Sequence, residues 1–321
     1  MSSSKNVAAR RFRGLTNVLA LTASLAMTAA MALPTHAQDK DATVSIATDQ
    51  GERTVPQSPE TVVVYDLATI DTLDGLGVAI DGVPAAPYPA HLADYAEDGT
   101  AKVGTLFEPD FEAVNALAPD LVITGGRSRS QTEALSDIAT TIDMSVDPAN
   151  YLESAMDRIR ALGTIFGKAD AANEAIETLQ ASITALNEEA EGAGKGLIVL
   201  TTGNRISAFG PGSRFGVLHT GFGIEAADPG LDTGNHGEAV SHEYIAKTDP
   251  DWLFVIDRDA AIGRGSAAAL LDNELVRGTK AWTNGRVVYL DAANWYLAGS
   301  GLQSMQKSVD QIREALRKGS S

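Results

Sequence analysis

The sequence of 321 residues contains no cysteine, so it forms no disulfide bond and offers no cysteine to which a lipid could be attached. Basic residues are also scarce, because 25 Lys and Arg stand against 42 Asp and Glu, which gives a formal net charge of −17 at pH 7. A surface with this excess of negative charge repels nucleic acids and anionic membranes. We therefore exclude a disulfide-stabilised scaffold and expect no nucleic acid partner.

Familiar hydrolase motifs are missing as well. The sequence has no Gly-x-Ser-x-Gly segment and no His-Glu-x-x-His segment, and no pair of carboxylates stands out from the acidic background. A secreted hydrolase is therefore only a remote alternative, which assays on model esters would identify. We expect a protein that is not an enzyme.

The N-terminal segment combines a basic start with a long apolar run. Four basic residues come first: Lys5, Arg10, Arg11 and Arg13. An apolar stretch from Leu15 to Leu33 follows, and Ala37 provides a small residue at the expected cleavage point. This pattern is typical of a secretory signal peptide, which we place at residues 1–37. A membrane anchor is the alternative, although several Thr, Asn and Ser residues interrupt the apolar run.

Cleavage after Ala37 would remove those four basic residues and no acidic one, so the formal charge would fall from −17 to −21. We expect the mature protein to be free and soluble outside the cytoplasm. The export route stays open between the Sec and Tat systems, because Arg10-Arg11-Phe12 matches only part of the twin-arginine pattern.

Strand patterns alternate with helical patterns along the chain from Thr43, which predicts an α/β fold. Apolar runs such as Val62–Tyr65, Leu121–Thr124 and Trp252–Ile256 indicate buried parallel strands. Between the two halves, apolar residues recur at helical spacing and predict one helix of about 18 residues. These residues are Leu152, Met156, Ile159, Leu162 and Phe166. We therefore expect two α/β lobes, residues 38–148 and 169–321, joined by a helix within residues 149–168, with a ligand cleft between the lobes.

Three arginines occupy positions suited to a ligand. Arg214 lies in Phe209–Gly216, where three glycines and a proline permit sharp turns, and we expect the turn to hold Arg214 outward. Arg127 and Arg258 follow two of the predicted buried strands, whose carboxyl ends face the ligand crevice in open α/β sheets. Arginine suits flat or multiply charged anions because its planar fork carries five donors. Surface ion pairs are the alternative for each arginine.

Several segments together identify a family that the chain resembles. In the second half they are Ser207–Gly216 (SAFGPGSRFG), Gly234–Gly237 (GNHG), Phe254–Arg258 (FVIDR), Leu271–Asn273 (LDN) and Asn294–Leu297 (NWYL). In the first half, Val103-Gly104 and Leu117–Ile123 (LAPDLVI) fit the wider class. The chain resembles the periplasmic substrate-binding proteins of ABC-type iron–siderophore importers, specifically the FatB/CeuE-like group that handles catecholate siderophores.

The resemblance implies a class III periplasmic binding protein fold, in which one rigid helix joins two α/β lobes. It implies that Arg127, Arg214 and Arg258 line the cleft and neutralise a ferric catecholate. It further implies that His236 and Tyr296 complete the iron shell when the siderophore supplies only four donors. Ferric iron, a hard cation, accepts oxygen and imidazole ligands, which agrees with these residue types.

The resemblance also implies the partners. We expect no intrinsic cofactor, ferric iron bound as a siderophore complex, and delivery by a monomer to an inner-membrane ABC permease. Glu108 and Glu238 are the residues we expect to meet arginines of the permease.

Some alternatives stay open. The cargo could be haem or a hydroxamate or citrate chelate instead of a catecholate. Taken without the resemblance, His236 reads as a histidine in a glycine-flanked loop and Tyr296 as an aromatic packed beside Trp295. Three nearby residues could each replace a named neighbour: Arg129, Arg205 and His242.

Overall fold

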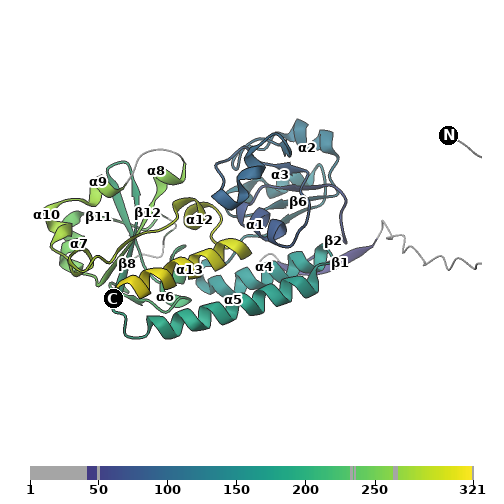
Figure 1. The fold of residues 1–321 in the computed structure, drawn as a ribbon. Coiled ribbons are helices and arrows are strands. Elements are labelled where there is room, and N and C mark those ends of the chain that lie inside the picture. The colour runs from purple at the N-terminus through teal and green to yellow at the C-terminus, as the bar shows by residue number, and fades with distance from the viewer. Residues whose placement is uncertain (1–41, 49–50, 232–233, 235, 263–266, 320–321) are drawn as a thin grey trace, which may run out of the picture. The chain divides into compact units, whose positions relative to one another are not determined.

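The computed structural model describes residues 42–48, 51–231, 234, 236–262 and 267–319 (Figure 1). The signal peptide expected at residues 1–37 lies outside these ranges. The described residues belong to one compact unit, Lys40–Ser321. Within them, no helix combines the length and the apolar character needed to cross a membrane.

The first sheet contains five parallel strands in the order β5-β4-β3-β6-β7. The central strands β3 and β6 are buried along their whole length, as expected for apolar runs in a parallel sheet. The strands are β3 (Val62–Val64), β4 (Gly82–Val83), β5 (Ala101–Lys102), β6 (Leu121–Thr124) and β7 (Thr141–Asp143). The accompanying helices are α1 (Leu67–Gly75), α2 (Phe111–Leu117) and α3 (Thr132–Ser136), with the 3-10 helices η1 (Ala90–Ala96), η2 (Gly126–Gln131) and η3 (Pro148–Asn150).

The second sheet follows the order β11-β9-β8-β12-β13, with β10 beside one end of β8. Strands β8, β12 and β13 are parallel, whereas β9 and β11 run antiparallel to their neighbours. The strands are β8 (Lys195–Thr202), β9 (Arg205–Phe209), β10 (Glu225–Ala226), β11 (Glu238–Val240), β12 (Trp252–Asp257) and β13 (Val287–Tyr289). The short helices are α6 (Val217–Thr220), α7 (His242–Thr248), α8 (Arg258–Ala261), α9 (Ala268–Leu271), α10 (Glu274–Arg277), α11 (Lys280–Thr283) and α12 (Ala292–Leu297).

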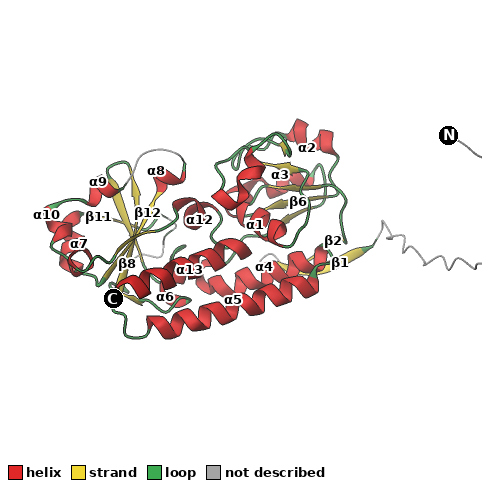
Figure 2. Cartoon of the chain, in the orientation of Figure 1, coloured by secondary structure: helices red, strands yellow, loops and turns green. Residues whose placement is uncertain are grey.

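Three longer helices lie side by side next to the sheets (Figures 1 and 2). They are α4 (Tyr151–Ile165), α5 (Ala169–Ala190) and α13 (Leu302–Gly319). Their apolar stripes meet in one buried cluster that includes Met156, Ile176 and Val309. Helix α4 follows the first sheet and α5 leads into the second, while a separate hairpin of β1 (Thr43–Thr48) and β2 (Gly51–Pro56) packs on α4.

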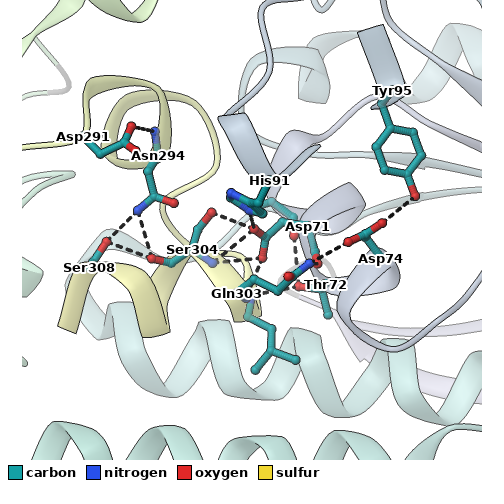
Figure 3. Close-up of polar contacts among 12 residues, drawn as sticks. Asp71, Thr72, Asp74, His91, Tyr95, Asp291, Asn294, Gln303, Ser304 and Ser308 are labelled. Atoms are coloured by element: carbon teal, nitrogen blue, oxygen red, sulfur yellow. Dashed lines mark hydrogen bonds and ion pairs between the residues drawn. The ribbon is translucent and has the colours of Figure 1, made fainter. Parts of the chain in front are cut away.

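A buried carboxylate ties α1 to the start of α13 (Figure 3). Asp71 is fully buried and accepts hydrogen bonds from the main-chain N–H of Gln303 at 2.7 Å and of Ser304 at 3.1 Å. The hydroxyl of Ser304 donates to it at 2.7 Å, and Nε2 of His91 lies 2.6 Å away. The first N–H groups of a helix have no partner inside the helix. Asp71 therefore caps α13 from a residue more than 200 positions earlier in the chain.

The structure confirms the predicted α/β class and most of the predicted elements. The middle helix is shorter than expected, because α4 has 15 residues. The two-residue strands β4, β5 and β10 escaped prediction, since two residues carry no periodicity. The lobe bounds 38–148, 149–168 and 169–321 stay a prediction.

Candidate ligand-binding site

Arg127 and Arg258 follow strand ends, as expected, and Arg214 lies in the expected turn. Arg127 lies in η2 directly after β6, and Arg258 is the first residue of α8 directly after β12. Arg214 follows β9 through a turn in which Ser213 donates both its N–H and its hydroxyl to the carbonyl of Gly210. The turn is compact enough to require Gly216, because a Cβ there would lie 2.0 Å from the carbonyl oxygen of Pro211.

Tyr296 in α12 brings the three arginines together. Its main-chain carbonyl accepts hydrogen bonds from Nη2 of Arg127 at 2.6 Å and from Nη2 of Arg214 at 3.0 Å. Its hydroxyl accepts a hydrogen bond from Nε of Arg258 at 3.0 Å. The guanidinium carbons of Arg127, Arg214 and Arg258 lie 4.8, 4.8 and 5.7 Å from the centre of its ring, within the range of cation–π attraction.

The position of Arg214 corrects one expectation. Instead of pointing outward, its partly buried guanidinium turns toward Tyr296 and lies 4.6 Å from the ring centre of Phe215. The reason is that the carbonyl of Tyr296 and two aromatic rings offer it partners. Burial, and then the like charge of Arg127, lower the pKa of Arg214.

The positive charge at this site is not neutralised by ion pairs within the described part of the chain. Among the described residues, none of the three arginines forms an ion pair with Asp or Glu. Burial alone would raise the pKa of the Tyr296 phenol. The hydrogen bond from Arg258 and the charges of the three arginines outweigh burial, so the pKa of Tyr296 lies below its ordinary value of 10.0. The site is therefore prepared for negative charge.

A cavity of about 740 Å³ opens beside this cluster. Arg214, Arg258, Tyr296 and His236 all line it. Ring Nε2 of His242, which also lines it, lies 2.9 Å from the carbonyl oxygen of Leu270. His236 is exposed, and its imidazole is consequently accessible to a ligand in the cavity.

The neighbours that could have replaced a site arginine differ in their surroundings. Arg129 forms an ion pair with the buried Asp143, with 3.0 Å between Nε and Oδ2. Arg205 is exposed and lines the 740 Å³ cavity. Glu108 and Glu238, the expected permease contacts, are both exposed. The roles of all predicted site residues stay predictions.

Sequence reasoning missed two features of the site. The main-chain carbonyl of Tyr296 holds two arginines, and no side-chain pattern could reveal it. Tyr151, the first residue of α4, lies close enough to Arg214 for that charge to act on its pKa, although burial dominates and raises the pKa. An aromatic residue at a helix start carries no signal for such a role.

A second cavity, of about 620 Å³, lies between β1 and α4. Its arginines are already engaged, because Arg160 pairs with Asp157 at 2.7 Å and Nε of Arg158 donates to the carbonyl of Ser145 at 3.1 Å. Three carboxylates also line this cavity: Asp147, Glu153 and Asp157. It is therefore less suited to an anion than the cavity beside Tyr296.

Known proteins resemble this chain in sequence and in fold. The petrobactin-binding protein YclQ of Bacillus subtilis is 41% identical over 280 residues, which cover 86% of this chain and 88% of the relative. Its crystal structure matches with a TM-score of 0.83 over 86% of this chain and 99% of that one. The ferric-anguibactin-binding protein FatB of Vibrio anguillarum is 30% identical, over 86% of this chain and 88% of the relative.

A third similar protein is the periplasmic catecholate-siderophore binding protein VctP from Vibrio cholerae. Its crystal structure is 31% identical, with a TM-score of 0.79 over 86% of this chain and 100% of that one. These matches confirm the expected class III fold. The periplasmic binding protein family itself is matched over residues 62–293, which is most of the chain. The chain therefore belongs to the periplasmic binding protein family.

Proposed function

We propose that the protein captures a ferric siderophore outside the cytoplasm and delivers it to an ABC permease for iron uptake. One observation carries the proposal: three arginines without ion-pair partners among the described residues converge on Tyr296 beside a cavity of about 740 Å³. Clustered guanidinium groups repel one another, and an anionic ligand offsets that repulsion. The siderophore-binding names of the similar proteins support the same class of cargo.

Among ferric chelates, we favour catecholates. A ferric complex of several catecholates carries excess negative charge and presents oxygen acceptors to the arginines. A neutral hydroxamate complex would leave the three charges uncompensated. Haem and ferric citrate are the remaining alternatives.

A binding panel followed by intrinsic fluorescence tests this assignment. The protein without residues 1–37 would be titrated with ferric catecholate, ferric hydroxamate, ferric citrate and haem. We expect ferric catecholate to bind tightest. If another member of the panel binds more tightly, that ligand replaces catecholate as the proposed cargo. If none of the ferric complexes binds, the proposed function is overturned.

We further propose that His236 and Tyr296 ligate iron when the siderophore leaves two positions vacant. Imidazole nitrogen and phenolate oxygen both bind ferric iron, and the lowered pKa of Tyr296 favours its ionised form. His236→Ala and Tyr296→Phe should weaken binding of a tetradentate bis-catecholate strongly and of a hexadentate tris-catecholate little. Equal losses for both complexes would show that the two residues shape the cavity without touching iron. If the tetradentate complex is unaffected, His242 is the next candidate.

Delivery to the permease is proposed to use the exposed Glu108 and Glu238, with the protein acting as a monomer in the periplasm after removal of a cleavable signal peptide. Reversing both charges should leave siderophore binding intact and stop iron uptake by cells. Normal uptake by the double variant would remove these residues from the interface.

A further inference from the structure

Phe107 is the most exposed large apolar side chain among the described residues, with 61% of its surface accessible. It lies in the loop Gly104–Asp110, which follows β5. Because the strands of the first sheet are parallel, this loop leaves the same edge of the sheet as η2, which carries Arg127. The topology thus places an exposed aromatic ring and a site arginine at one edge.

Internal hydrogen bonds hold the loop in a defined conformation. The N–H of Thr105 donates to the carbonyl of Glu108 at 2.9 Å, and the hydroxyl of Thr105 accepts from the N–H of Phe107 at 3.3 Å and of Glu108 at 3.1 Å. Gly104 has φ +97°, and a Cβ there would lie 2.4 Å from the N atom of Asp110. A rigid loop presents an exposed ring with little loss of conformational entropy on binding.

Two contacts connect the loop to the arginine site. Nε2 of Gln131, the last residue of η2, donates to the carbonyl of Phe107 at 3.2 Å. Leu106 is buried in a hydrophobic cluster that includes Leu297, and Tyr296 packs against this cluster. The carbonyl of Phe107 is therefore bonded to the segment that carries Arg127, and the side chain of the preceding Leu106 packs with the helix that carries Tyr296.

We propose that Phe107 forms an apolar wall of the ligand site and contacts an aromatic ring of the bound siderophore. This inference rests on the proposed function. The arginines recognise negative charge, which catecholate and citrate complexes share, whereas a phenyl ring recognises only ligands with an apolar or aromatic face. Phe107 would accordingly select aromatic chelates among anionic ones.

Three variants test the proposal by titration with a ferric bis-catecholate: Phe107→Ala, Phe107→Leu and the matched control Phe111→Ala. Phe111 is also exposed, at 39%, but no described contact links it to Arg127 or Tyr296. We expect Phe107→Ala to weaken binding about tenfold, Phe107→Leu by less, and Phe111→Ala within twofold of the parent. The melting temperature of Phe107→Ala should stay close to that of the parent because most of this ring is exposed.

Parental affinity for Phe107→Ala, or equal losses for Phe107→Ala and Phe111→Ala, would overturn the proposal. If the parent protein itself binds no ferric catecholate, the proposed function has failed instead. A Phe107→Ala protein that binds normally but no longer supports iron uptake in cells would make Phe107 a contact for the permease, which also overturns the proposal.

Discussion

Arg214 shows how a single residue can be unfavourable in the empty protein and favourable in the complex. Its guanidinium is partly buried and close to Arg127, and both circumstances disfavour its charge. An anionic ligand reverses the balance, because charge-assisted hydrogen bonds contribute roughly 1.5–3 kcal/mol each.

Arg214→Ala should therefore weaken binding of a ferric catecholate about ten- to a hundredfold, and the melting temperature of the empty protein should not fall. Fluorescence titration and thermal unfolding would measure the two effects. Arg129→Ala is the control, since Asp143 already engages that guanidinium. Equal affinity of Arg214→Ala and the parent would remove Arg214 from the site.

Tyr296 should be the first tyrosine to ionise as pH rises. Its pKa is lowered, whereas the pKa values of the other six tyrosines (Tyr65, Tyr88, Tyr95, Tyr151, Tyr244 and Tyr289) are raised, chiefly by burial. The near-ultraviolet phenolate absorbance of the parent should rise in a first step below pH 10, and Tyr296→Phe should lack it. Persistence of that step in the variant would assign it to another tyrosine.

The same shift has a consequence for stability. An acid whose pKa is lower in the folded protein than in the unfolded chain stabilises the fold above its unfolded pKa, here about 10 for tyrosine. This contribution is lost as pH falls through the folded pKa of Tyr296. The parent should therefore gain stability relative to Tyr296→Phe as pH rises toward 10.

At the scale of single residues, prediction from the sequence depended on recognising strands and glycine-containing turns. Arg127, Arg214 and Arg258 could be named because each follows a recognisable strand or glycine-containing turn. The inward direction of Arg214 could not be predicted from the sequence, because it depends on the carbonyl of Tyr296, which lies 82 positions away in the chain.

The start of α13 illustrates the scale of elements, because its N–H groups are capped by a residue of α1. Asp71 is fully buried and accepts hydrogen bonds from four groups, among them the hydroxyl of Ser304 and the ring of His91. Residues of η1, α1 and α13 thus share one carboxylate (Figure 3).

Asp71→Asn should destabilise the protein by about 1–3 kcal/mol, because an amide replaces one acceptor oxygen by a donor and leaves buried N–H groups unpaired. Urea unfolding would measure the change. Asp74→Asn is the matched control on the same helix: Asp74 is exposed, and we expect a change within about 0.5 kcal/mol. Similar values for both variants would show that the buried cap contributes little.

Elements with a strong pattern were predictable from sequence, and elements built by distant partners were not. The apolar stripes of α4, α5 and α13 and the buried runs of β6 and β12 stand out in the sequence. The contact between α1 and α13 does not, because Asp71 looks like any surface aspartate on a helix.

At the scale of the whole molecule, the arginine site is a positive exception in an acidic protein. The formal charge of the full chain is −17. At low ionic strength, about 0.01 M, charges act over ~30 Å, so an anionic ligand experiences the whole surface, whereas at 0.15 M they act over ~8 Å.

The association rate of a ferric tris-catecholate should therefore rise when salt is added from about 0.01 to 0.15 M, because distant carboxylates are screened before the arginines at the site. Stopped-flow fluorescence would measure the rate. A rate that falls steadily over this range would mean that the local arginines already govern the approach of the ligand.

The main-chain carbonyl of Tyr296 has one more consequence, which concerns how the site could change over evolution. Every residue type at position 296 supplies that carbonyl, so mutation of the side chain leaves the anchor for Arg127 and Arg214 in place. Among the three arginines, only Arg258 donates a hydrogen bond to the phenol hydroxyl, whereas all three lose the attraction of the ring when the side chain is replaced. A new side chain at position 296 would change the group that the protein offers to the iron of a siderophore, while the arginines that attract anions stay in place. Position 296 is therefore a natural starting point for redesigning which ligands this binding protein accepts.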